Sequence, residues 1–243
     1  MEFSVVDEAK RKGFNLYGGL DPANVPRYTR KDAERATGVP ASTVGVWVHG
    51  MPYTNTKGDR DRYEPVIDLP NQKDPRLSFN NLLEVNVLRA LREVHEVRLR
   101  VVRQAMENAR QEWDIDRLLI HPNLRATNGK LFLDYYFQLT DLSNTKQLVM
   151  RSLLADSLKR VEVDEELLAR AFFPEPRFMP KDSQPILVSP FISFGNAILE
   201  RRGISTYAIR SRVDSGESPE SIKEDYEVTE EEFQEAIRYE AAA

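Results

Sequence analysis

The residues with the clearest chemical purpose are seven cations between positions 27 and 62, where only four acidic residues accompany them. Lys and Arg side chains neutralise phosphate charge. A local excess of them therefore indicates nucleic-acid binding, even in a chain whose net charge is −5. We predict that these side chains bind DNA: Arg27, Arg30, Lys31, Arg35, Lys57, Arg60 and Arg62.

Other kinds of site chemistry find little support in the residue pattern. The three histidines are far apart, and the sequence has no H-E-x-x-H motif, Gly-rich phosphate loop or G-x-S-x-G elbow. Without cysteine there is no disulfide, thiolate metal site or cysteine nucleophile. We expect a protein that is not an enzyme and uses no metal or cofactor. The alternative is a site assembled only by folding, with Asp114, Asp116 and His121 as its first candidates.

The cations surround residues 28–50, whose pattern predicts two short helices joined by a tight turn. Thr29 can cap the first helix, and Gly38 suits the positive φ that follows its last turn. The second helix is predicted to bury one side, which carries Val44, Trp47 and Val48 at helical spacing. This is the helix-turn-helix plan, in which the second helix is free to enter a major groove. Its groove side is predicted to carry Ser42, Thr43, Val46 and His49.

Residues 28–50, YTRKDAERATGVPASTVGVWVHG, resemble the helix-turn-helix of MerR-like regulators. Two features depart from that family. Glu34 stands where a small residue is usual, and Gly45 and Val46 stand where the exposed face usually carries Arg or Lys. The alternative is a small αα-hairpin that binds only protein. Downstream, a strand at 66–69 would make residues 57–62 the tip of a wing-like hairpin, and a mobile loop is the alternative there.

The composition is that of a water-soluble, globular, intracellular protein. No apolar run approaches the ~18 residues of a membrane span, and the N-terminal residues lack the apolar region of a signal peptide. We expect a cytoplasmic protein with no membrane contact. Its 243 residues predict three regions. These are 1–76, with an N-terminal arm and the DNA-binding helix-turn-helix; 77–185, helical and β; and 186–243, helical. The expected fold class is α+β, mostly helical.

The central region begins with two predicted amphipathic helices, 79–91 and 99–113. Their outward arginines are interspersed with acids, which favours a solvated face over a second DNA contact. Asn128-Gly129 then predicts a hairpin leading into a strand over 131–139.

The rest of the region is less clearly patterned. Residues 145–161 fit either one helix or two strands. Asp164 is expected to cap a short helix that stops at Pro174, and 174–185 to be a linker.

The C-terminal region predicts a strand at 186–188 and then three helices, opened by Ser205, Ser218 and Thr229. These three helices form a second unit of helix-turn-helix shape. From Asp214 to the end, however, eleven acids face two cations. Phosphates repel such a unit at ordinary salt, so we expect it to contact a basic surface instead of DNA.

The runs SPFISFGNAILERRGISTYAI and GESPESIKEDYEVTEEEFQEAIRYE resemble a family of small domains of unknown function that is common in antitoxins encoded beside PIN-like toxins. Asn196 and Ile204-Ser205-Thr206 depart from its usual corner and turn. With the N-terminal motif, the whole chain is similar to a VapB-type antitoxin with an added DNA-binding domain. That resemblance implies binding to double-stranded operator DNA, repression of its own operon and neutralisation of a PIN-like ribonuclease.

Paired helix-turn-helix units read two half-sites, so we expect a homodimer. The candidate toxin-binding residues are exposed acids of the C-terminal unit: Glu224, Asp225, Glu230, Glu231 and Glu235. Three alternatives stay open. The acidic unit could be a solubilising cap or a dimerisation module. The chain could be a protein-interaction scaffold, or a transcriptional regulator with no toxin partner.

Overall fold

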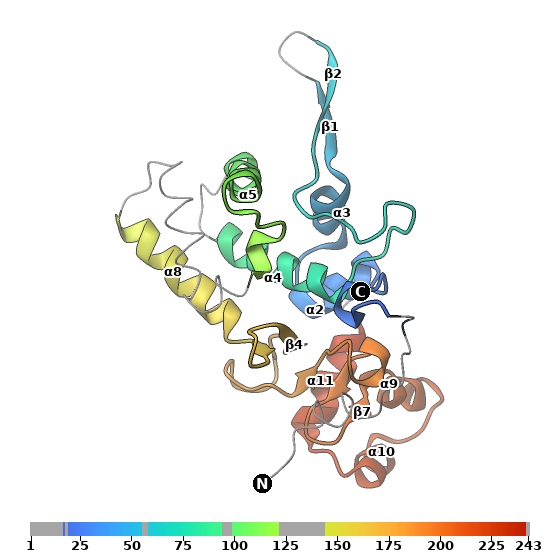
Figure 1. Cartoon of the computed structure of the whole chain (residues 1–243). Coiled ribbons are helices and arrows are strands. Elements are labelled where there is room, and N and C mark those ends of the chain that lie inside the picture. Colours follow the sequence, from blue (N-terminus) through green and yellow to red (C-terminus); the bar gives the residue numbers. More distant parts are fainter. Residues whose placement is uncertain (1–16, 18, 55–57, 94–98, 122–143, 242–243) are drawn as a thin grey trace.

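The computed structural model describes Tyr17 and residues 19–54, 58–93, 99–121 and 144–241 (Figure 1). Over these ranges the chain is α+β and mostly helical, with eight α-helices and three small antiparallel sheets. This confirms the predicted fold class. None of the described helices is long and apolar enough to cross a membrane.

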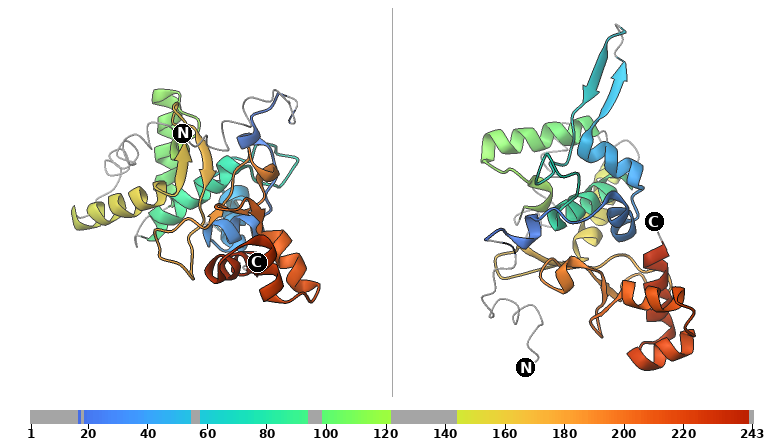
Figure 2. Two further views of the ribbon diagram at one scale, coloured as in Figure 1. Left: turned by 90° about the horizontal axis from the view of Figure 1, so that it is seen from below. Right: turned by 90° about the vertical axis from the view of Figure 1, so that its right-hand side faces the viewer.

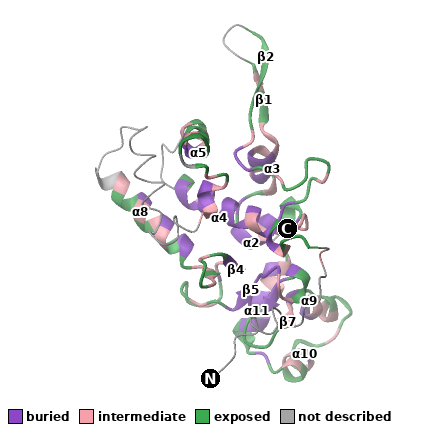
Figure 3. Ribbon diagram, viewed as in Figure 1, coloured by how far each residue is buried: buried purple, intermediate pink, exposed green. Residues whose placement is uncertain are grey.

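Helix α4 (Phe79–Glu93) forms the centre of the molecule, and every residue from Asn81 to Leu88 is buried (Figure 3). Such a helix must be covered on all sides. Helix α2 (Arg30–Thr37) and helix α8 (Asn144–Leu158) pack directly on it, and the short turn η2 (Leu118–Ile120) lies between it and helix α5 (Leu99–Trp113). The expected helices at 79–91 and 99–113 are therefore confirmed.

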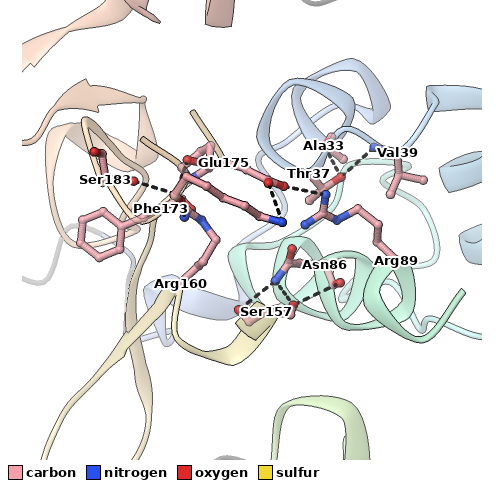
Figure 4. A network of polar contacts seen from close by, with 12 residues as sticks. Ala33, Thr37, Val39, Asn86, Arg89, Ser157, Arg160, Phe173, Glu175 and Ser183 are labelled. Atoms are coloured by element: carbon pink, nitrogen blue, oxygen red, sulfur yellow. Dashed lines mark hydrogen bonds and ion pairs between the residues drawn. The ribbon is translucent and has the colours of Figure 1, made fainter. Parts of the chain in front are cut away.

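Polar side chains buried along α4 find partners on neighbouring elements. The Glu84 carboxylate accepts two hydrogen bonds from the Arg117 guanidinium, from Nε at 2.9 Å and from Nη2 at 2.7 Å. Asn86 Nδ2 donates to Ser157 Oγ on α8 at 2.6 Å (Figure 4). These bonds satisfy polar groups that would otherwise be costly to bury.

The region after α4 and α5 contains one confirmed alternative and one wrong prediction. Residues 144–158 form a single helix, α8. Asp164 does not cap a helix, because its carboxylate accepts the N–H groups of Glu166 and Leu168, both at 3.0 Å, and closes a tight turn. That turn joins β3 (Val161–Val163) to β4 (Ala169–Phe172). The hairpin and strand predicted at 128–139 lie outside the described residues.

Residues 174–185 contain no helix or strand, as a linker would, but they are held in place. The Arg160 guanidinium donates to the carbonyl oxygens of Phe173, Pro174, Lys181 and Ser183 at 2.6–3.2 Å (Figure 4). The Arg160 side chain thus holds this segment against the end of α8.

The C-terminal unit starts with the sheet β5 (Ile186–Leu187), β6 (Ile198–Leu199) and β7 (Ile204–Ser205), and the turn η3 (Ser193–Gly195) lies between β5 and β6. Three helices follow: α9 (Thr206–Asp214), α10 (Pro219–Tyr226) and α11 (Glu230–Ala241). Ser218 and the Thr229–Glu232 capping box start α10 and α11 as predicted. Ser205 precedes α9, but its side chain makes no cap hydrogen bond.

Candidate nucleic-acid interface

Helix α2 and helix α3 (Ala41–His49) form the predicted helix-turn-helix, and they are joined as the sequence indicates. Thr29 Oγ1 accepts the Asp32 N–H at 3.2 Å, and the Thr29 N–H donates to the Asp32 carboxylate at 2.8 Å. Gly38 ends α2 at φ 75°, a conformation that suits glycine. The Thr29–Asp32 box thus starts α2, and Gly38 ends it three residues before α3 begins.

The buried side of α3 consists of Val44, Trp47 and Val48, as predicted. The Trp47 carbonyl accepts the N–H groups of Val66 at 2.8 Å and Ile67 at 3.0 Å. Residues 66–69 are therefore not the expected strand. They pack beneath α3 because Val66 and Ile67 are apolar and are needed in the core.

The wing itself exists, but its returning strand comes earlier in the chain than predicted. Strand β1 (Met51–Thr54) pairs with strand β2 (Arg60–Tyr63) in an antiparallel hairpin that projects from the end of α3 (Figures 1 and 2). Gly50, at φ 70°, is required at its root, because a Cβ there would lie 2.0 Å from the Tyr63 carbonyl oxygen. Lys57, which was predicted to lie at the tip, is outside the described residues.

The hairpin has two different faces, because successive side chains of a strand point to opposite sides. Tyr53 and Tyr63 stack on one face with ring centroids 4.1 Å apart. Arg60 and Arg62 belong to the other face, and both are exposed. Arg62 also donates to the His49 carbonyl, which ties the wing to the end of α3.

The predicted groove side of α3 faces outward. Ser42 is exposed, and Thr43, Val46 and His49 are half-buried. Glu34, the unusual residue of α2, accepts the Ala41 N–H at 3.2 Å and so caps the start of α3. Of the predicted cations, Arg30 and Lys31 are exposed on α2.

Arg27 and Arg35 lie elsewhere, which corrects their expected place at the DNA surface. Arg27 Nη2 donates to Asn196 Oδ1 at 2.6 Å. Arg35 Nη1 lies 3.4 Å from the carboxylates of both Asp32 and Glu240. Both arginines are half-buried against the C-terminal unit. No sequence signal could have placed them there, because their partners lie far away in the chain.

One contact missed from the sequence lies on α3 itself. Gly45 is buried beneath the side chain of Arg30, and a Cβ at Gly45 would be 2.7 Å from Arg30 Nη1. The positive charge absent from the α3 sequence is therefore supplied by α2. The signal was Gly45 itself, since glycine in the middle of a helix usually has a packing reason.

The acids predicted to bind a toxin divide into two groups. Glu224, Asp225, Glu230 and Glu231 are exposed on α10 and α11, with Asp225 paired to Arg212 and Glu230 to Lys223. Glu235, in contrast, is fully buried. Its carboxylate accepts the N–H groups of Arg177 and Phe178 and the Nε–H of Arg238. The prediction that Glu235 is an exposed docking residue is therefore wrong.

Of the three candidates for a hidden catalytic site, Asp116 has a partner of another kind. Asp116 lies 3.5 Å from Arg110 Nε, as one partner in a surface ion-pair network. Within the described ranges, no group of three or more His, Asp or Glu side chains could hold a metal ion.

Comparisons with known proteins agree with this arrangement. Residues 26–106 match a family described as "Putative DNA-binding HTH domain", and residues 186–239 match "Protein of unknown function (DUF433)". The fold is similar to the X-ray crystal structure of Rv2018 from Mycobacterium tuberculosis, with a TM-score of 0.61 and 19% identity over 88% of this chain and 98% of that one. No curated protein matches.

These matches confirm two expectations and leave others as proposals. The chain has an N-terminal helix-turn-helix domain of a DNA-binding type and a C-terminal domain of a family of unknown function. The structural likeness, at this identity, concerns the fold alone.

Proposed function

We propose that this chain is a DNA-binding antitoxin that represses its own operon and neutralises a PIN-like ribonuclease. The observation that carries the proposal is the surface formed by α3 and the wing. In it the outward side of α3 lies between exposed cations, with Lys31 on one flank and Arg60 and Arg62 on the other, and Arg30 lies over the helix itself. Cations that flank the outward side of a helix are placed to meet phosphates while that side lies in a major groove.

The toxin half of the proposal is supported by charge and position. Helices α10 and α11 lie at the end of the molecule opposite the wing (Figure 1). Glu224 and Glu231 are exposed there and make no ion pair with a described residue. A ribonuclease attracts RNA phosphates, so its groove is electropositive. An acidic helical unit is complementary to such a groove in sign, and opposite potentials speed association.

We further propose a cytoplasmic homodimer that uses no cofactor and catalyses no reaction. Two copies of α3 on a two-fold axis would meet successive major grooves about 34 Å apart. Placing the DNA surface and the acidic unit at opposite ends would let one chain bind both partners together.

The DNA part is tested by titrating the full chain with duplexes from its own upstream region and with shuffled duplexes of the same composition. We expect tighter binding to the upstream region and a steep loss of affinity with salt, because phosphate contacts release counterions. Equal binding to both duplexes, or no binding, would contradict operator recognition.

The toxin part is tested in cells that express the neighbouring reading frame, which we expect to encode a PIN-like protein. The intact chain should restore growth, and the double variant Glu224→Lys, Glu231→Lys should not. The double variant Glu162→Lys, Glu166→Lys is the control, because it makes the same charge change at exposed residues of β3 and of the turn after it. Full protection by the Glu224→Lys, Glu231→Lys variant would favour a regulator whose acidic unit does not bind the toxin.

A further inference from the structure

The contact between Arg30 and Gly45 has an unusual geometry. A Cβ built on Gly45 would lie 2.7 Å from Arg30 Nη1 and 3.5 Å from Arg30 Cδ. The guanidinium therefore rests on α3 at the point where a side chain of residue 45 would begin. Any other residue at position 45 would displace it.

This position is in the middle of the outward face of α3. One side of the helix carries four residues, because three of them lie three, four and seven positions after the first: Ser42, Gly45, Val46 and His49. Ser42 is exposed, and Val46 and His49 are half-buried. None of these four residues carries a formal charge when histidine is counted as neutral. Arg30 therefore supplies a cation to a face of α3 that has no Lys or Arg of its own.

The Arg30 guanidinium is free to bind a ligand. It forms no hydrogen bond or ion pair with any residue that the structure describes, and it is exposed. Its neighbours differ, since Arg27, Arg35 and Arg62 are each engaged by other parts of the chain. Five N–H donors in a planar fork thus lie over the helix face with no partner among the described residues.

We propose that Arg30 reads a guanine in the major groove, and that Gly45 is the positioning residue that allows it to do so. The inference rests on the proposed DNA binding. The guanidinium fork matches O6 and N7 of guanine, and Arg bidentate to guanine is the commonest base-specific contact. A cation on the face that enters the groove meets base edges, whereas one on the flank, such as Lys31, meets phosphate. Arg30 of α2, which lies over Gly45 of α3, would thus take the place of the Arg or Lys that the exposed face of α3 lacks.

The test measures the affinity of the full chain for its operator and for operators with each G·C pair replaced in turn. For the intact chain, replacement of one G·C pair in each half-site should weaken binding roughly 5- to 150-fold. Arg30→Ala should weaken binding to the unchanged operator. Replacing that G·C pair should then weaken the binding of this variant no further. Arg30→Lys keeps the charge but not the fork, so it should retain binding to non-operator DNA and lose most of the guanine preference.

Two further variants separate reading from simple attraction. Lys31→Ala should weaken binding to all sequences by a similar factor and lower the salt slope by about one. Gly45→Ala should reduce the preference for guanine at that pair, as Arg30→Ala does. The double variant Arg30→Ala, Gly45→Ala should have the same preference as Arg30→Ala alone. Circular dichroism checks that each variant keeps its helices, and Ala at position 45 favours helix.

Two outcomes would overturn the inference. If Arg30→Ala weakens all duplexes equally, Arg30 is a phosphate contact and the proposed DNA binding stands without it. If Gly45→Ala still changes preference in the Arg30→Ala background, Gly45 does not act through Arg30. An intact chain that prefers no duplex would overturn the proposed function as well, which distinguishes the two failures.

Discussion

The phenolic hydroxyl of Tyr28 donates a 3.1 Å hydrogen bond to the carbonyl of Gly195, which joins the residue just before the helix-turn-helix to the C-terminal unit. Gly195 has φ 79°, and a Cβ there would lie 2.5 Å from Tyr28 Oη. Burial raises the pKa of Tyr28, so the phenol stays protonated and keeps donating across the ordinary pH range. The DNA-binding domain and the C-terminal domain are thus in direct contact at a point with no room for a larger residue.

The first prediction concerns this contact. Gly195→Ala should lower the free energy of unfolding by about 1–3 kcal/mol, because it adds a steric clash to a left-handed backbone. Tyr28→Phe should cost less, about 0.5–1.5 kcal/mol for one hydrogen bond. Gly203→Ala is the matched control, since Gly203 has φ 68° but nothing within 4 Å of its Cβ position. Urea unfolding measures all three, and equal losses for both glycine variants would show that the close approach does not matter.

The second prediction concerns the core under α3. Trp47→Ala should cost about 3–5 kcal/mol, because it opens a cavity in the core beneath α3. Met51→Ala, at an exposed position on the wing, should change stability by less than about 0.5 kcal/mol. Denaturant unfolding followed by circular dichroism gives both values. An intact, equally stable Trp47→Ala protein would mean that the tryptophan is not in the core.

The third prediction concerns the charged pair inside the molecule. Arg117→Ala should cost about 3–5 kcal/mol, because it leaves the buried Glu84 carboxylate without its cation. Arg110→Ala removes only surface ion pairs and should cost no more than about 1 kcal/mol. Replacing Glu84 and Arg117 together by apolar residues should recover much of the loss. A double variant as unstable as Arg117→Ala alone would argue that packing, not charge, makes this site important.

The fourth prediction concerns acid stability. The Arg201 guanidinium, which hydrogen-bonds the Glu232 carboxylate, holds the pKa of that carboxyl below its usual range. A lowered folded-state pKa adds stability above the unfolded value of about 4.3, and this stability is lost as pH falls through the folded value. Glu232→Gln should therefore flatten the dependence of unfolding free energy on pH below about 4.3. Arg201→Gln should do the same, and an unchanged pH profile in both would exclude this pair as its cause.

The fifth prediction separates flanking cations from interdomain ones. Replacing Lys31 and Arg60 by Ala should weaken DNA binding at every sequence and lower the salt slope by about two, one for each lost phosphate contact. Arg35→Ala should leave the slope unchanged, because Arg35 lies against Glu240 of the C-terminal unit. Binding measured from low to moderate salt gives the slopes. A reduced slope for Arg35→Ala would return that residue to the DNA surface.

Short-range signals made much of this fold predictable. The Thr29–Asp32 box, the positive-φ Gly38 and the Thr229–Glu232 box act within three or four residues, so they have the same meaning in any fold. The family matches agree with the helix-turn-helix at one end and the small domain of unknown function at the other.

Local rules failed where a distant segment competed for the same residues. Asp164 is a good helix cap, yet the chain after it forms a strand, because Phe172 and Val188 exchange two 2.8 Å backbone hydrogen bonds. A strand that gains a partner from another part of the chain can outweigh a short helix, whose nucleation is costly.

The sequence by itself determined where the capped helices α2, α10 and α11 begin, and therefore the helix-turn-helix class of the first domain. Tertiary structure alone decided which charges remain available for a partner. Arg35 and Glu235 look equally exposed in the sequence, but folding turns one toward Glu240 and buries the other beneath residues 177 and 178. The same folding laid Arg30 over Gly45. The physical reason is that a charged side chain is placed by the partner it meets, and that partner can lie anywhere in the chain.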